Sequence, residues 1–229
     1  MRLGVICARG GSKRIPKKNI RNFAGRPIIC WSVDAARASK CFDRIIVSTD
    51  DPEISTLAES LGLEVPFQRP IELAHDHVGT VEVMAHATAW AQSEGLQLDA
   101  VACLYPAAPF MISADLALAL EVLLAGDWAY VFPATKFPAP IHRAFEETVQ
   151  GNLSMFFPEH FSTRSQDLPV ALYDAGQFYW GRPQAWLNQL PMIGPQSTAL
   201  KIPPWRVQDI DTPEDWAEAE LRWAWLNNR

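Results

Sequence analysis

Short apolar runs alternate with helix-like segments along the first 133 residues of the chain. Strands that are apolar on both faces are typical of parallel sheets covered by helices on both sides. We therefore predict an α/β fold with a mostly parallel sheet, in which ligands bind beyond the carboxyl ends of the strands. Strands are expected at 3–8, 44–48, 64–67, 100–104 and 128–133, and helices at 27–39, 52–62, 80–93 and 113–124.

The alternation of apolar runs and helix-like segments is lost between about residues 138 and 200, where proline and aromatic residues are frequent and periodicity is weak. A last helix is expected after Thr212. A length of 229 residues fits one large domain or two small ones. We interpret the chain as a single domain, 1–229, with an insertion at about 138–200 that serves substrate closure or subunit contact.

The segment ARGGSKRIPKKNIR, residues 8–21, follows the first predicted strand directly. Residues 1–26 contain eight basic residues and no acidic one, which leaves 12 of the 20 basic residues against all 26 acidic ones, a net charge of −14. A protein this acidic elsewhere repels the phosphate backbone of nucleic acids. The segment therefore indicates a local pocket for a small polyanion.

Two adjacent glycines, Gly10 and Gly11, let backbone N–H groups approach phosphate oxygens, because they have no Cβ. Arg9, Lys13 and Lys18 can then neutralise a triphosphate. The segment matches neither the P-loop nor the dinucleotide-binding motif. A solvated basic loop and a nucleic-acid patch are the alternatives.

Asp209 and Asp211 lie two residues apart in QDIDTPEDW, so in an extended chain both carboxylates face one side. Mg²⁺ is commonly held by one or two carboxylates together with substrate phosphates. The alternative is that Thr212 and Asp215 only cap the last helix. Both interpretations can hold, because they use different side chains.

Four cysteines without a CxxC pair indicate reduced thiols, and neither a secretory signal nor a membrane-spanning run is evident. We therefore expect a cytoplasmic protein. His75 and His77 flank Asp76, but we assign no metal to them.

Four segments in order, ARGGSKRIPKKN, CFDRIIVSTDD, RPIELAHD and VQDIDTPEDW, resemble the cytidylyltransferases that activate eight- and nine-carbon 2-keto sugar acids. This is the CMP-sialic acid and CMP-Kdo synthetase family. The resemblance implies a three-layer, Rossmann-like nucleotidyltransferase fold with an insertion for dimerisation and substrate binding. It also implies transfer of CMP from CTP with Mg²⁺, and a homodimer with residues 138–165 at its interface.

Within that family, RGGSKRIPKKN and FSTRSQDLPVALYDAGQFYWG are most similar to the members that use pseudaminic acid. Sialic, legionaminic and Kdo acids are the alternative acceptors. A non-catalytic nucleotide-binding regulator is the alternative from another functional class, and retention of Lys18, Asp209 and Asp211 counts against it.

The resemblance assigns roles to individual residues. Catalysis falls to Arg9, Lys13, Lys18 and Asp211, and the metal to Asp209 and Asp211. Nucleotide binding falls to Arg9, Gly10, Gly11, Ser12, Lys13, Lys18, Asn19, Arg69, Val78 and Thr80.

The sugar-binding region departs from the family pattern in two places. The family's L-Q-P-T-S-P-L-R is LYPAAPFM at 104–111, and the R-P-N-G of the sialic acid enzymes is YDAG at 173–176. Both departures count against sialic acid as the acceptor. The residues expected to bind the sugar are Tyr105, His142, Arg164, Gln177 and Tyr179, with Arg164, His142 and then Arg143 as candidates for its carboxylate.

Overall fold

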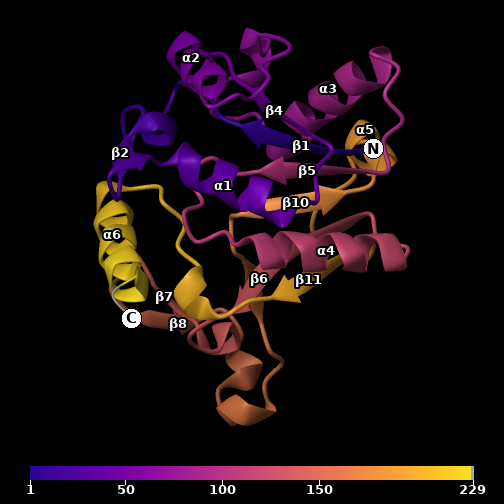
Figure 1. Cartoon of the computed structure of the whole chain (residues 1–229). Helices are drawn as coiled ribbons and strands as arrows, with labels where there is room; N and C mark the ends of the chain where they lie inside the picture. Colours follow the sequence, from indigo (N-terminus) through magenta and orange to yellow (C-terminus); the bar gives the residue numbers. More distant parts are fainter. Residues whose placement is uncertain (228–229) are drawn as a thin grey trace.

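In the computed structural model, which describes residues 1–227, seven strands form one mixed sheet at the centre of the molecule (Figure 1). Their order is β11-β6-β10-β5-β1-β4, with β9 paired to β6 beside this path. The strands are β1 (Arg2–Cys7), β4 (Arg44–Ser48), β5 (Ala100–Leu104), β6 (Tyr130–Lys136), β9 (Leu172–Asp174), β10 (Phe178–Gly181) and β11 (Ser197–Lys201).

The sheet is mostly parallel, as predicted. Strand β1 pairs in parallel with β4 and β5, so that Val5 lies between Ile46 and Cys103. Strand β11 pairs in parallel with β6. Strand β10 is antiparallel to both of its neighbours, β5 and β6, and β9 is antiparallel to β6.

Helices cover both faces of the sheet and make the fold three-layered. Buried side chains of α1, α2 and α4 share one core with one face of the sheet, and those of α3 and α5 share a second core with the other face (Figure 1). The last helix, α6, packs over a third, smaller core beside the basic segment at residues 8–21, which we call the basic loop. The helices are α1 (Ile29–Ser39), α2 (Pro52–Ser60), α3 (Thr80–Ser93), α4 (Ser113–Ala125), α5 (Pro183–Leu187) and α6 (Pro213–Asn227).

Two helix starts have the caps that the sequence predicts. The Asp51 carboxylate accepts the N–H groups of Glu53 and Ile54, at 2.8 and 3.1 Å, and Pro52 occupies the first turn of α2. Before α6, the Asp215 N–H donates to Thr212 Oγ1 at 3.2 Å, and the Thr212 N–H donates back to the Asp215 carboxylate at 2.7 Å.

Two local predictions differ from the structure. Pro27 lies in the small strand β3 (Arg26–Pro27), which pairs with β2 (Asn22–Phe23), and α1 begins only at Ile29. Residues 64–67 make a single bridge, from Glu64 to Ile46, in place of a strand. Pro66 has no N–H to donate to a ladder, and pairing resumes only in a second bridge, from Gln68 to Thr49.

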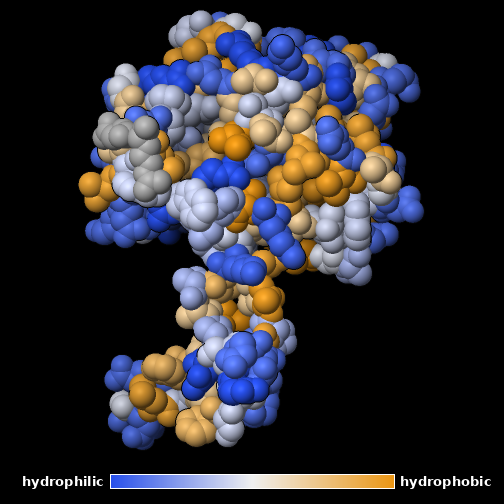
Figure 2. All heavy atoms as spheres, turned by 60° about the horizontal axis from the view of Figure 1, so that its bottom comes forward, coloured by the Kyte–Doolittle hydropathy of each residue, from blue (hydrophilic) through white to orange (hydrophobic). Residues whose placement is uncertain are grey.

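The segment from about 138 to 171 projects from the body as an arm (Figures 1 and 2). It contains a hairpin of β7 (Phe145–Glu147) and β8 (Leu153–Met155) and three short 3₁₀ turns. The rest of the predicted insertion, from β9 to β11, belongs to the main sheet. No helix within residues 1–227 combines the length and the apolar character needed to cross a membrane.

Candidate active site

Two adjoining cavities lie at the carboxyl ends of the parallel strands. The Arg69 cavity, about 340 Å³, opens beyond β1 and β5. The Tyr173 cavity, about 880 Å³, opens beyond β6 and β11. The antiparallel β10 begins between them, and Asp209 lines both. A ligand in one cavity would therefore lie next to a ligand in the other at Asp209.

Most residues predicted to bind a nucleotide line the Arg69 cavity. Asp209 and Asp211 join them there from the far end of the chain. Gly10, Gly11 and Lys13 lie beside the cavity without lining it, and the Lys13 side chain is 82% exposed. The predicted residues in the lining are Arg9, Ser12, Lys18, Asn19, Arg69, Val78 and Thr80.

Gly10 is required for close packing in the basic loop. Its N–H donates to the Asp50 carboxylate at 3.0 Å, so this donor is already engaged. A Cβ at Gly10 would lie 2.3 Å from an oxygen of Asp51. Gly11 has open space around it and stays the better placed of the two for a phosphate group.

Three cations of the basic loop were predicted to bind phosphate, and each is paired with a carboxylate: Arg9, Lys13 and Lys18. Arg9 and Lys13 reach the two oxygens of Asp76, at 2.7 and 2.6 Å. These two partners hold the pKa of Asp76 below its usual value, Lys13 more than Arg9. Lys18 lies 3.2 Å from Asp211.

Arg14, to which no role was assigned, lies 2.7 Å from the second oxygen of Asp211. The buried Asn19 donates to the carbonyl of Arg9 at 2.9 Å and so holds the loop against itself. A bound polyphosphate would compete with Asp76 and Asp211 for these cations.

Arg69 is 4% exposed at the end of β4. Its Nε donates to Ser48 Oγ at 3.0 Å, and a second guanidinium nitrogen donates to the Ser48 carbonyl. Within residues 1–227 no carboxylate lies within 4.0 Å of it. A guanidinium offers donors only, so this buried charge suits a ligand with carbonyl or ring-nitrogen acceptors.

Asp209 and Asp211 form a charged pair that fits a divalent cation. Removal from bulk solvent and the neighbouring Asp211 raise the pKa of Asp209, and Lys18 opposes the rise. The Asp209 side chain nevertheless stays accessible from the cavities. A divalent ion would relieve the repulsion between two oxygen ligands of the kind Mg²⁺ prefers, and would take its other ligands from water or substrate oxygens.

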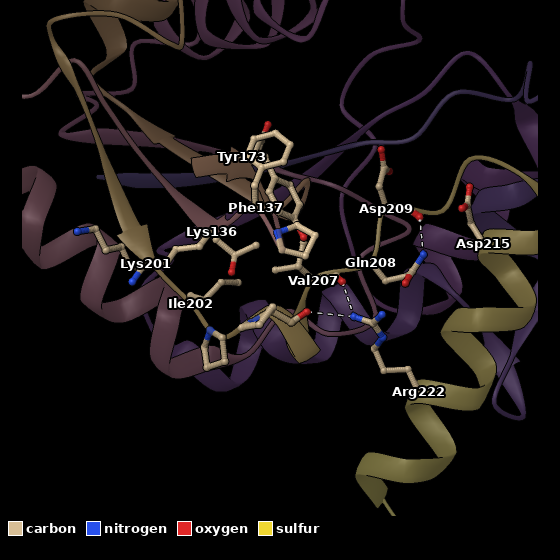
Figure 3. A pocket seen from close by; sticks show the side chains of 15 residues that line it. Lys136, Phe137, Tyr173, Lys201, Ile202, Val207, Gln208, Asp209, Asp215 and Arg222 are labelled. Carbon is tan, nitrogen blue, oxygen red and sulfur yellow. Dashed lines mark hydrogen bonds between the residues drawn. The ribbon is translucent and has the colours of Figure 1, made fainter. Parts of the chain in front are cut away.

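The Tyr173 cavity combines aromatic and cationic side chains (Figure 3). The rings of Phe137 and Tyr173 lie 4.9 Å apart. Lys136 and Lys201 stand at the ends of the adjacent strands β6 and β11, and neither forms a salt bridge in the described part of the chain. Arg222 is engaged by the carbonyls of Pro204 and Val207, at 3.1 and 2.6 Å. Three carboxylates, Asp174, Asp209 and Asp215, line the same cavity. An anionic ligand with an apolar face would therefore have to bind through Lys136 and Lys201 in particular.

The five residues expected to bind sugar lie elsewhere in this chain, and their roles stay predictions. Tyr105 lines the Arg69 cavity. Gln177 and Tyr179 are 3% and 2% exposed inside the body, as buried as Phe178 and Trp180, which were expected in the core. His142 packs against Phe157 and His160 on the arm, and Arg164 pairs there with Asp167 at 2.9 Å.

Sequence reasoning missed Lys136, Asp174, Lys201 and Asp76. The rule that ligands bind beyond strand ends, applied to β6 as it was to β1, would have pointed to Lys136. Asp76 lies in RPIELAHD and Asp174 in YDAG, two segments that the sequence analysis singled out without assigning a role to either residue, and Lys201 carries no local signal.

Known proteins resemble the chain over almost its whole length. A family model described as cytidylyltransferase matches residues 3–150. The pseudaminic acid cytidylyltransferase of Campylobacter jejuni is 39% identical over 219 residues, which are 96% of this chain and 94% of the relative. The CMP-N,N'-diacetyllegionaminic acid synthase of Legionella pneumophila is 29% identical over 225 residues, 95% of this chain and 94% of the relative.

A solved structure has the same fold. The CMP:2-keto-3-deoxy-manno-octonic acid synthetase, complexed with CTP, has a TM-score of 0.72 at 16% identity and covers 98% of this chain and 99% of its own. Together these matches span the body of the molecule, both cavities and the arm.

Proposed function

The chain belongs to the cytidylyltransferase family, and on this premise we propose that it transfers CMP from CTP to the anomeric hydroxyl of pseudaminic acid, a nine-carbon 2-keto sugar acid, releasing pyrophosphate. One observation carries the proposal: the Arg69 and Tyr173 cavities share Asp209. A nucleotide donor and a sugar acceptor must meet at one phosphorus atom, and the molecule offers two chemically different cavities that meet at a carboxylate.

The Arg69 cavity suits CTP. Arg69 presents guanidinium donors, and cytosine carries acceptors at O2 and N3. At the other side of the cavity, Arg9 and Lys18 come from the basic loop and suit a triphosphate. The α-phosphate would then lie toward Asp209 and Asp211.

The Tyr173 cavity suits the sugar acid. Lys136 and Lys201 supply positive charge for the carboxylate, and the rings of Phe137 and Tyr173 supply an apolar wall. The relatives named for pseudaminic and legionaminic acids match 96% and 95% of the chain. Legionaminic, sialic and Kdo acids are therefore the acceptors against which pseudaminic acid has to be tested.

The chemistry follows from these placements. The anomeric hydroxyl oxygen forms a bond to the α-phosphorus and gives up its proton to solvent water, the bond from that phosphorus to the bridging oxygen breaks, and pyrophosphate leaves with the electron pair. Negative charge grows on the leaving oxygens, where Lys18, Arg9 and Lys13 stabilise it once the polyphosphate has displaced Asp76. No covalent intermediate with the protein is needed.

Asp209 and Asp211 would hold Mg²⁺, which, when bound, supplies a Lewis acid for the phosphate oxygens. Burial first and the negative charge of Asp211 second raise the pKa of Asp209, and a bound divalent cation would relieve that repulsion.

The experiment is a pyrophosphate-release assay with CTP, Mg²⁺ and each of the four sugar acids in turn, with the CMP-sugar identified by mass spectrometry. We expect the highest kcat/KM with pseudaminic acid. Faster turnover of another acid would reassign the acceptor, and no CTP-dependent product with any of them would contradict catalysis itself.

We further propose a homodimer whose interface uses residues 138–165 of the arm, in the cytoplasm, where CTP is supplied. The arm exposes Phe145 (59%), Leu153 (69%) and Phe161 (71%), three large apolar side chains that a second copy would cover. Light scattering of the purified protein should give twice the monomer mass. The double variant Leu153→Ser, Phe161→Ser should give the monomer mass, and an unchanged mass would remove the arm from the interface.

A further inference from the structure

Three sulfur-containing side chains meet at the wall of the Arg69 cavity. Cys7 ends β1, Cys103 lies on the adjacent parallel strand β5, and their Sγ atoms are 3.7 Å apart. Met84, on α3, brings its Sδ atom within 3.6 Å of Cys7 Sγ. We call Cys7, Cys103 and Met84 the sulfur cluster. The chemistry proposed above uses none of the three.

The sulfur cluster is accessible from one side. Cys7 lines the Arg69 cavity, so a small ion in that cavity can reach its sulfur. Cys103 and Met84 lie behind it in the core under α3, and both are 0% exposed. Because Cys7 contacts each of the other two, an ion that binds Cys7 arrives next to two further sulfur atoms.

The spacing of the sulfur atoms fits a single metal ion. Thiolates bind zinc at about 2.3 Å, and two sulfurs at that distance from one ion stand about 3.7 to 4.0 Å apart at tetrahedral or trigonal angles. The two distances from Cys7, 3.6 and 3.7 Å, are close to this spacing. Thiolate and thioether ligands together select soft ions such as Cu(I), whereas Mg²⁺ prefers oxygen.

The charge of the surroundings suits such a complex. A monovalent ion with two thiolates and one thioether carries a net charge of −1, and a buried charge needs a partner. Arg69 is a buried cation, and within residues 1–227 no carboxylate lies within 4.0 Å of it. The hydrogen bond from Cys103 and the charge of Arg69 lower the pKa of Cys7, against burial. Burial and Cys7 raise the pKa of Cys103, and Arg69 opposes the rise.

We propose that the sulfur cluster binds one soft monovalent cation of the copper(I) class, which enters through the Arg69 cavity. Cys7 and Cys103 bind as thiolates and release one proton each to solvent, and Met84 binds as a neutral thioether. No electron is transferred. The site is distinct from the carboxylates of Asp209 and Asp211, which suit Mg²⁺.

One consequence rests on the proposed function. An ion bound at Cys7 occupies the wall of the Arg69 cavity and neutralises part of the charge of Arg69, which is assigned there to cytosine. Copper(I) should therefore weaken the binding of CTP, and the protein should be inhibited by soft metal ions at a site remote from the reacting phosphorus.

The test measures copper binding and needs neither nucleotide nor sugar acid. The reduced protein is titrated without oxygen with Cu(I) in competition with bathocuproine disulfonate, a copper(I) chelator, and X-ray absorption at the copper edge counts the sulfur neighbours. The variants are Met84→Leu and Cys103→Ala. Their matched controls are Met111→Leu and Cys30→Ala, the same substitutions in the core on the other face of the sheet.

The wild type should retain one Cu(I) with three sulfur neighbours. Met84→Leu keeps the volume of the side chain but leaves two sulfur neighbours, and Cys103→Ala removes a thiolate. Each should lower the copper affinity by at least about tenfold, since the loss even of a group that only supports a ligand commonly costs that much. Met111→Leu and Cys30→Ala should bind copper as the wild type does.

A wild type that yields all its copper to the chelator would overturn the inference. Wild-type affinity in Met84→Leu and Cys103→Ala, or equal losses in the two controls, would overturn it as well. Should Cys103→Ala fail to fold, Cys7→Ser removes the central ligand at the cavity wall and must abolish binding. Failure of the proposed function looks different: copper would bind as described while the affinity for CTP, measured by calorimetry with Mg²⁺, stayed the same in its presence.

Discussion

The ammonium group of Lys18 lies 3.2 Å from the carboxylate of Asp211, although 193 residues separate them in the chain. The same ammonium donates to the Ile210 carbonyl at 2.7 Å. The basic loop after the first strand and the acidic segment before the last helix are thus joined at the point where a triphosphate and its metal ion would sit.

Replacing Lys18 by methionine should lower kcat for pyrophosphate release by about 10²- to 10³-fold, the usual cost of losing one placed charge on a transition state. Lys17→Met is the matched control. Lys17 belongs to the same loop but is exposed and pairs with Glu53 at 2.6 Å, so its loss should change kcat less than about threefold. Equal losses in both variants would contradict a specific role for Lys18.

Asp76→Asn should bind CTP and inorganic pyrophosphate more tightly, by about two- to fivefold. The substitution removes the carboxylate that holds Arg9 and Lys13 and that competes with phosphate for them. Titration calorimetry with pyrophosphate alone checks this without turnover. Weaker binding would instead make Asp76 part of the binding surface.

Lys201→Met and Lys136→Met should raise KM for the sugar acid while KM for CTP stays within about twofold, because both lysines line the Tyr173 cavity and neither lines the Arg69 cavity. Lys40→Met, at the exposed end of α1, is the control. A rise in KM for CTP alone would place the nucleotide, not the sugar, in that cavity.

In the absence of metal, Asp209 should make the free energy of unfolding fall as the pH rises. Its pKa is raised in the folded protein, so the folded state holds its proton more tightly than the unfolded chain. This contribution is complete below about pH 3.9, the ordinary value for Asp, and is lost as the pH rises through the folded pKa.

Thermal melting in EDTA checks whether stability falls as the pH rises. Asp209→Asn does not titrate, so its melting temperature should exceed that of the wild type near pH 7, and the difference should shrink toward pH 4. Adding Mg²⁺ should raise the melting temperature of the wild type but not of Asp209→Asn. Asp127→Asn, on the exposed surface outside both cavities, should follow the wild type in all three conditions.

The first half of the fold could be predicted because its signals are local. Asp51 and Pro52 mark the start of α2, and Thr80 and Ser93 bound α3 as expected. The place of β10 could not be predicted, because pairing Phe178 with Leu104 joins segments far apart in the chain.

The contrast between local signals and long-range pairing also explains which parts of the candidate site could be predicted from the sequence. The Arg69 cavity is built largely from contiguous motifs after β1 and before α3, which sequence reasoning detects. The Tyr173 cavity needs Lys136 and Lys201, which carry no motif, and Tyr173, which lies in the YDAG segment that departs from the family pattern. Tyr179 is 2% exposed, because a strand in the middle of a sheet is covered on both faces, and its role in sugar binding stays a prediction.

The central position of β10 also decides when the sheet can be completed during synthesis. β5 and β6 leave the ribosome first, and until residue 181 has emerged each lacks the partner that lies between them. A nascent chain from which residues up to about 150 have emerged contains the basic loop, Arg69 and Thr80, yet it exposes two unpaired strand edges. Translating polysomes of this protein therefore present, for the time needed to add some thirty residues, edges that can pair between chains. The finished molecule hides those edges at its centre.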